Sequence, residues 1–173
     1  FDPACTHYRQ DHWLGQGVYF FLSQEQAYWW ASSISSHNRG STPLIYQVQI
    51  TAPDEKVLNL DDNEQVALFF SRIEDAYFQA LKEEKQPIFT NETLRALFFD
   101  YYKKEYGVSV IVATFQKDCV RYAGVPQHGE RLELQKELAK RLGIYFKETQ
   151  VCVSDKLCIK ETAIVYDGED EVI

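Results

Sequence analysis

The segment from Trp13 to Ala31 constrains the fold more than any other part of the chain. It begins with a glycine pair, Gly15 and Gly17, and continues with the apolar run Val18-Tyr19-Phe20-Phe21. Glycine allows a positive φ angle or the close approach of a ligand, and β-branched and aromatic residues favour a strand. Ser23 followed three residues later by Gln26 predicts a capping box at the start of a helix. The segment therefore predicts a glycine turn, a short strand and a helix.

The aromatic side chains of this segment favour a pocket for a flat ring. The helix carries Trp29 and Trp30, so aromatic faces follow the glycine turn within roughly twenty residues, and ligand sites combine such faces with exposed backbone. The alternative is that a strand rich in Tyr and Phe and a helix with two tryptophans form only hydrophobic core.

A family resemblance favours the pocket. The pattern Gly15-x-Gly17-Val18-Tyr19-Phe20, followed by Ala27-x-x-Trp30-Ala31, resembles the second conserved block of the ADP-ribosyltransferases. It is closest to the poly(ADP-ribose)-polymerase-like branch and to small bacterial toxin or defence domains of that superfamily. The resemblance implies that Tyr19 packs on the nicotinamide of NAD and that Trp29, or else Trp30, covers the other face. It makes Gly15, Gly17, Phe20 and Gln26 the other cofactor-binding residues.

The late segment Glu148-Thr149-Gln150 carries the expected chemistry. Cleavage of the nicotinamide–ribose bond creates an oxocarbenium-like centre, which a carboxylate stabilises. The resemblance places Gln150 where the family has its catalytic glutamate, and a glutamine can bind a ribose hydroxyl but cannot act as a base. Glu148 lies two residues earlier and so faces the same side of a strand. Glu148 is therefore the preferred carboxylate, with Glu161 second; the alternative is that Glu148 is an ordinary exposed acid.

The resemblance implies an NAD-dependent ADP-ribosyltransferase, a glycosyltransferase for which NAD is the substrate rather than a resident cofactor. Its acceptor would be a macromolecule, protein or nucleic acid, and its setting that of a cytoplasmic bacterial toxin of the toxin–antitoxin type or a defence effector. A cognate inhibitor protein is a further partner that this class admits. Two alternatives stay open: a module that binds NAD, ADP-ribose or a partner protein without turnover, and an NAD glycohydrolase.

Composition and charge disfavour several other functional classes. The net charge of −8 disfavours non-specific binding to nucleic acid. Neither a run of 18 apolar residues nor a signal peptide is visible, so no membrane association is expected. The four cysteines form no Cys-x-x-Cys pair, so we expect no metal site and a reduced, cytoplasmic chain, with a single disulfide as the alternative. The chain has no methionine, and the family's first strand would precede Phe1, so a fragment or processed form is expected.

The rest of the chain predicts one α+β domain over residues 1–173, with two small, packed, mainly antiparallel sheets and flanking helices. Strands are expected at residues 44–51, 56–60, 108–115, 144–153 and 157–166, and further helices at 63–82, 90–106 and 131–142. Residues 63–106 form a helical insertion in which two helices pack on each other. Arg39, in the loop 32–43, is a candidate phosphate contact.

Apolar spacing also predicts which faces of the helices are buried. Asn63 is expected to cap the first helix of the insertion. The predicted buried stripes consist of Val66, Phe69, Phe70, Ile73, Tyr77 and Leu81 in that helix, Leu94, Leu97, Phe98 and Tyr101 in the second, and Leu134, Leu138 and Leu142 in the helix over 131–142.

Overall fold

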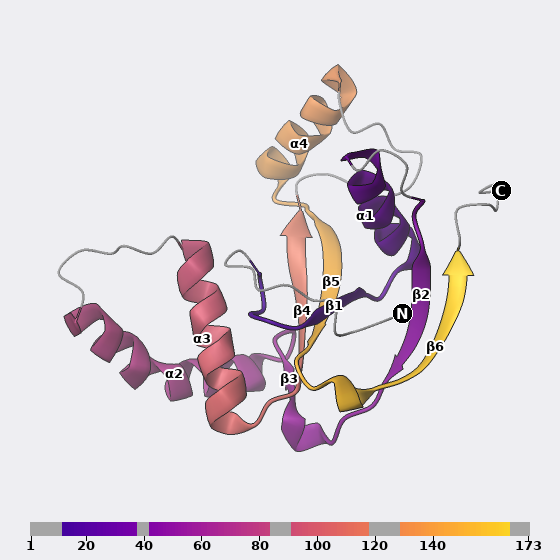
Figure 1. The fold of residues 1–173 in the computed structure, drawn as a ribbon. Helices are drawn as coiled ribbons and strands as arrows, with labels where there is room; N and C mark the ends of the chain where they lie inside the picture. Colours follow the sequence, from indigo (N-terminus) through magenta and orange to yellow (C-terminus); the bar gives the residue numbers. More distant parts are fainter. Residues whose placement is uncertain (1–11, 38–41, 84–90, 118–128, 167–173) are drawn as a thin grey trace. The chain divides into compact units, whose positions relative to one another are not determined.

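The structure is a computed structural model that describes residues 12–37, 42–83, 91–117 and 129–166 (Figure 1). The candidates Cys5, Arg39 and Cys119 lie outside these residues. The described elements, in chain order, are β1 (Val18–Phe21), α1 (Gln24–His37), β2 (Ile45–Ile50), η2 (Asp54–Lys56), β3 (Val57–Asn59), α2 (Asn63–Glu83), α3 (Asn91–Tyr106), β4 (Val110–Lys117), α4 (Glu130–Leu142), β5 (Phe146–Val153), η3 (Lys156–Cys158) and β6 (Ile159–Tyr166).

The strands form two small sheets. One has the order β1-β5-β4-β3 and the other pairs β2 with β6. Strands β3 and β4 are parallel, with Val57 opposite Val110, and the sheets are mostly antiparallel otherwise. The predicted α+β class, with two small mainly antiparallel sheets and flanking helices, is therefore confirmed for the described residues.

The chain divides into two compact units. The first comprises Phe1–Tyr19, Ile50–Ala113 and Val151–Lys160, and the second comprises Phe20–Gln49, Thr114–Gln150 and Glu161–Ile173. Helices α2 and α3 therefore belong to the first unit, and α1 and α4 to the second. The single domain over residues 1–173 stays a prediction.

An aromatic cluster joins α2 to α3 in the first unit, where Figure 1 shows the two helices against each other. The ring of Phe69 stacks on Phe99 at 5.1 Å between centroids and meets Tyr102 edge-on at 4.9 Å. Arg72 donates a hydrogen bond of 2.9 Å to the Tyr102 hydroxyl. Aromatic pairs at such distances add stability beyond the area they bury. The predicted packing of these helices on each other is confirmed.

The predicted buried stripe of α3 is wrong. The buried residues are Ala96, Phe99, Tyr102 and Lys103, whereas Leu97 is 41% exposed and Tyr101 40% exposed. Leu94 and Phe98 are only half-buried. Apolar residues occupy more than one side of this helix, so periodicity alone does not choose the buried face. The buried face is the one that carries the aromatic cluster and Lys103 with its partners.

The predicted stripe of α4 is wrong for a similar reason. Leu132 and Ala139 are buried, whereas Leu134, Leu138 and Leu142 are between 45% and 65% exposed. The predicted end of the helix is confirmed, because Gly143 adopts a left-handed conformation with φ of 66°. In α2 the stripe is correct at Phe69, but Phe70 and Tyr77 are exposed.

The helix starts show one more correction. The cap of α2 is Asp62, whose carboxylate accepts the backbone N–H of Glu64 at 2.8 Å, so Asn63 is the first helical residue rather than the cap. Strand β2 alternates at Tyr46 to Gln49, with half-buried and exposed residues in turn. Within the described residues no helix combines the length and the hydropathy that crossing a membrane requires.

Candidate functional site

The chain's own packing requires glycine at both positions of the predicted turn. Gly15 has a φ of 75°, and a Cβ atom there would overlap the carboxylate of Asp100 and lie 3.0 Å from the Lys103 ammonium. A Cβ atom at Gly17 would lie 2.6 Å from the Cys152 sulfur. The positive φ is confirmed at Gly15. The space around both α-carbons is filled by protein atoms, so packing explains the two glycines without a ligand.

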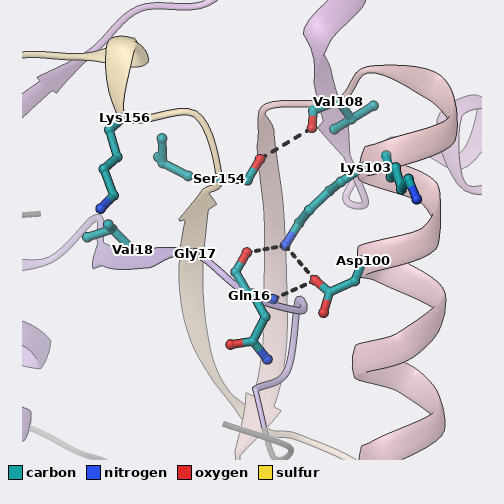
Figure 2. Close-up of a pocket in the computed structure, with 10 residues that line it drawn as sticks. Gln16, Gly17, Val18, Asp100, Lys103, Val108, Ser154 and Lys156 are labelled. Carbon is teal, nitrogen blue, oxygen red and sulfur yellow. Dashed lines mark hydrogen bonds and ion pairs between the residues drawn. The ribbon is translucent and has the colours of Figure 1, made fainter. Parts of the chain in front are cut away.

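Asp100 and Lys103 of α3 clamp the backbone of Gln16, between the two glycines (Figure 2). Gln16 N–H donates to Asp100 Oδ1 at 2.6 Å, and Lys103 Nζ donates to the Gln16 carbonyl oxygen at 2.7 Å. The two side chains form an ion pair at 3.5 Å. Lys103 is only 8% exposed, and a buried ammonium requires such partners. The charge pair therefore fixes the turn to the helix.

Cys152 lies behind this turn with its thiol fully buried. Its sulfur is 3.4 Å from Lys103 Nζ. Burial raises the pKa of the Cys152 thiol, although the neighbouring ammonium acts in the opposite direction. The thiol is therefore held protonated and serves packing rather than nucleophilic chemistry.

The Tyr19 hydroxyl forms two hydrogen bonds with the backbone of the same turn. It accepts the Leu14 N–H at 2.7 Å and donates to the Gly15 carbonyl oxygen at 2.7 Å. Burial is the main cause that raises the pKa of Tyr19 far above its ordinary value. The half-buried ring lies 4.9 Å from the ring of His12. The hydroxyl thus fixes the ring plane by bonding the turn, which sequence reasoning did not anticipate.

The two tryptophans form an aromatic cluster in the second unit. The ring of Trp30 stacks on Phe21 at 6.1 Å, and Trp29 meets Trp30 edge-on at 5.3 Å. Phe20 and both tryptophans are half-buried, so each keeps part of its surface exposed. The clamp of Tyr19 and Trp29 around a ring stays a prediction.

Glu148 and Gln150 lie together on β5, as their spacing predicts. The side-chain amide of Gln150 donates to Glu148 Oε1 at 2.7 Å. Glu148 is 1% exposed and Gln150 is 8% exposed. The alternative of an ordinary exposed acid is therefore wrong. Glu161, the second carboxylate candidate, is exposed on β6.

Lys117 of β4 provides the countercharge for this pair. Its ammonium lies 3.6 Å from Glu148 Oε1 and is itself nearly buried. Removing a carboxylate and an ammonium from water costs several kcal/mol each, roughly, which the pairing repays only in part. Lys117 carries no local sequence signal of this role, because its partner Glu148 lies on another strand.

Gln26 has a different role from the predicted one. Its side-chain amide donates to the Lys147 carbonyl oxygen at 3.1 Å and is buried at 7% exposure. The Ser23 hydroxyl accepts the Gln26 N–H at 3.4 Å, but instead of reaching back to complete the capping box, the Gln26 side chain ties α1 to the start of β5. Its amide therefore supports the strand that carries Glu148.

The described residues contain no group of three or more His, Cys, Asp or Glu side chains that could hold a metal ion. Asp100, Lys103 and Lys117 are the charged residues that the sequence analysis missed. The one local signal was the Asp100–Lys103 spacing on a helix, which is common on exposed surfaces. Comparison of the chain with protein-family models, with curated proteins and with solved structures gave no match.

Proposed function

We propose that this chain binds NAD and transfers its ADP-ribose to a macromolecular acceptor. The observation that carries the proposal is the buried pair of Glu148 and Gln150, hydrogen-bonded at 2.7 Å on one face of β5. The resemblance of residues 13–31 to the ADP-ribosyltransferases supports it, because that family places a residue of this strand at the ribose of NAD.

The burial of the pair suggests separate roles for its two members. Gln150 is the more exposed of the two, so its amide is the group that we expect to contact a ribose hydroxyl. Glu148 accepts an N–H of that amide and thereby fixes its orientation. The carboxylate also supplies negative charge close to a developing oxocarbenium centre, where a low dielectric strengthens the interaction. Glu148 is thus a positioning residue, and Gln150 the binding one.

The family resemblance assigns contact with the nicotinamide ring to Tyr19. The two hydrogen bonds of the Tyr19 hydroxyl fix its ring plane, and a preorganised ring loses little entropy when a ligand stacks on it. In the second unit, the half-buried rings of Trp29 and Trp30 keep part of their aromatic surface exposed.

A second candidate function is binding of NAD or ADP-ribose without turnover. Lys117 lies 3.6 Å from the Glu148 carboxylate and offsets the negative charge that an oxocarbenium centre needs. A glutamine at position 150 cannot act as a base. These observations favour a catalytically weak relative over an efficient enzyme. An NAD glycohydrolase differs from a transferase only in using water as the acceptor.

The test is release of nicotinamide from NAD, measured by chromatography, for the chain and for its Gln150→Ala and Glu148→Gln variants. Lys147→Ala is the matched control, because Lys147 is exposed on the same strand. We expect release by the parent chain and the control, and at least a hundredfold slower release by Gln150→Ala, since positioning and electrostatic contacts contribute roughly that much.

The outcomes separate the candidates. Tight NAD binding without release, measured by calorimetry, would favour the binding module. Free ADP-ribose in place of a modified acceptor would indicate a glycohydrolase. Absence of both binding and release would refute the proposal. Circular dichroism of each variant verifies folding, because Glu148→Gln leaves the buried Lys117 without its carboxylate.

A further inference from the structure

Helix α2 carries three aromatic side chains that are exposed on one face. Phe70, Tyr77 and Phe78 have exposed fractions of 60%, 42% and 50%. Their sequence separations place them on the same side of an α-helix. Glu74 lies between them, one helical turn after Phe70 and one turn before the other two, and side chains at such spacings have Cβ atoms about 5–6 Å apart. These four residues form the aromatic face of α2.

Neighbouring rings hold the rings of the aromatic face in place. The ring of Tyr77 lies 5.7 Å from that of Phe98 on α3 and 6.1 Å from that of Phe78. The ring of Phe70 lies 5.8 Å from that of Phe69, which is buried. Phe69 thus faces α3 while Phe70 faces solvent. Because the rings already have neighbours that fix them, little conformational entropy is lost when another molecule covers the face.

The exposed aromatic area has the size of an interaction surface. An aromatic side chain has about 150–250 Å² of surface, so these exposed fractions leave roughly 300 Å² in contact with solvent. The largest exposed apolar patch on a typical monomeric protein is about 300–600 Å² and is often functional. The helical spacing of Phe70 and Tyr77 predicts burial, whereas the structure leaves both exposed. A partner that covers the face would supply the burial that the spacing predicts.

Glu74 gives the aromatic face its charge. It is exposed, and it forms neither an ion pair nor a side-chain hydrogen bond with any residue that the structure describes. Arg72, the nearest basic residue of the helix, is directed to α3, where it donates to the Tyr102 hydroxyl and lies 4.6 Å from the Tyr106 ring. A carboxylate among exposed rings complements a lysine or arginine side chain, because the carboxylate and the ring faces both attract a cation.

We infer that the aromatic face of α2 binds a basic amphipathic helix of another protein. The apolar side chains of that helix would pack on the exposed rings, and a lysine or arginine beside them would pair with Glu74. Packing of apolar side chains at helical spacing is a recurrent mode of recognition. The surface does not depend on the proposed function, because none of its four residues is proposed to contact NAD.

A second copy of the chain complements the face less well. In a symmetric dimer the same patch meets itself, so the two Glu74 carboxylates would approach each other. Helix α2 has four acidic and two basic residues, and the whole chain has a net charge of −8. Like charges therefore oppose a dimer through this helix, and they favour a basic partner.

The test is calorimetric titration of the chain with a synthetic helical peptide of leucine and lysine, with the leucines on one face. Two control peptides have the same pattern: one has glutamate in place of lysine, and the other has serine in place of leucine. We expect binding of the leucine–lysine peptide in the micromolar range. The glutamate peptide should not bind, and the serine peptide should bind at least about tenfold more weakly, since it lacks the apolar anchors.

Variants of α2 then locate the binding surface. Phe70→Ala/Phe78→Ala should weaken binding at least about tenfold, and Glu74→Gln about twofold to fivefold, as expected for an exposed ion pair. Leu68→Ala and Asp75→Asn are the matched controls, because both residues are exposed on the same helix outside the aromatic face. Circular dichroism verifies that each variant folds, which we expect because the replaced side chains are exposed.

Three results would overturn the proposal. The first is absence of binding of the leucine–lysine peptide, or equal binding of the serine peptide, which would reduce the attraction to charge alone. The second is equal weakening by the control variants. The third is a dimer of the parent chain in sedimentation velocity that Phe70→Ala/Phe78→Ala converts to a monomer, which would assign the face to a second copy. Absence of nicotinamide release with intact peptide binding would count only against the proposed function.

Discussion

Replacement of Gly15 by alanine tests whether the Asp100–Lys103 clamp stabilises the fold. Gly15 has a φ of 75°, and the added Cβ would overlap the Asp100 carboxylate that accepts the Gln16 N–H. Gly143 is the matched control. It has a similar φ of 66°, but no atom lies within 4 Å of an added Cβ. Both variants therefore place an alanine at positive φ, and only Gly15→Ala also displaces the Asp100 carboxylate.

The expected magnitudes follow from this geometry. An alanine in the left-handed region costs about 1–2 kcal/mol, which is the whole effect expected for Gly143→Ala. In Gly15→Ala the carboxylate must also move from the Gln16 N–H, and a hydrogen bond to a charged group is worth about 1.5–3 kcal/mol. The expected total is roughly 2.5–5 kcal/mol. Globular domains have about 5–15 kcal/mol of stability, so this loss is a large and measurable fraction of the total.

The assay is urea unfolding, monitored by tryptophan fluorescence, with the free energy of unfolding compared at a constant slope. In an Asp100→Ala background the second part of the cost should disappear, leaving about 1–2 kcal/mol for Gly15→Ala, because the obstructing carboxylate is gone. Equal destabilisation by Gly15→Ala and Gly143→Ala in the parent chain would refute the reasoning. The clamp would then contribute nothing to the position of the turn.

Two further predictions concern single side chains. Tyr19→Phe should lower the free energy of unfolding by about 1–3 kcal/mol at pH 7, because the Leu14 N–H loses its acceptor. The pKa of the Tyr19 hydroxyl is raised in the folded chain, so the unfolded chain loses this proton first, and the free energy of unfolding should fall as the pH rises above the ordinary value of 10.0. Urea titrations between pH 7 and 11 measure this decline. In Tyr19→Phe the part of the decline that is due to this hydroxyl should be absent. Leu132→Ala should cost about 2–5 kcal/mol, whereas Leu138→Ala should cost less than about 1 kcal/mol because Leu138 is 45% exposed. Comparable losses would contradict the observed face of α4.

The order and type of the elements were predictable, because their signals are local, but residues 32–37, predicted as part of a loop, belong to helix α1. The apolar run of β1, the alternation of β2 and the glycine ends of α3 and α4 each lie within a few residues of the element that they define. The buried faces were less predictable. Both α3 and α4 have apolar residues on more than one side, and the face that is buried depends on partners distant in the sequence. Phe69, for example, is 30 positions from its stacking partner Phe99.

The residues of the candidate site were likewise predictable only in part. Glu148 and Gln150 are two residues apart on one strand, so their shared face followed from strand geometry. The Asp100 carboxylate and the Gln16 N–H are separated by 84 positions. Nothing in the local pattern distinguishes Asp100 from an ordinary exposed acid on a helix, and Lys117 meets Glu148 only through the pairing of two strands. Contacts of this range require the fold itself.

The structure gives a packing reason for some of the residues that carry the family resemblance, but not for all of the residues proposed to act in the site. The glycine turn would be expected even in a chain without a ligand, because Asp100, Lys103 and Cys152 fill the space beside Gly15 and Gly17. Tyr19 likewise has a structural role through its hydroxyl. Glu148 is different, since burial of a carboxylate with a lysine generally stabilises a fold less than apolar side chains of the same volume. A structural role alone accounts for the turn but leaves the buried Glu148 unexplained, so the proposed chemistry depends more on β5 than on the segment that first suggested it.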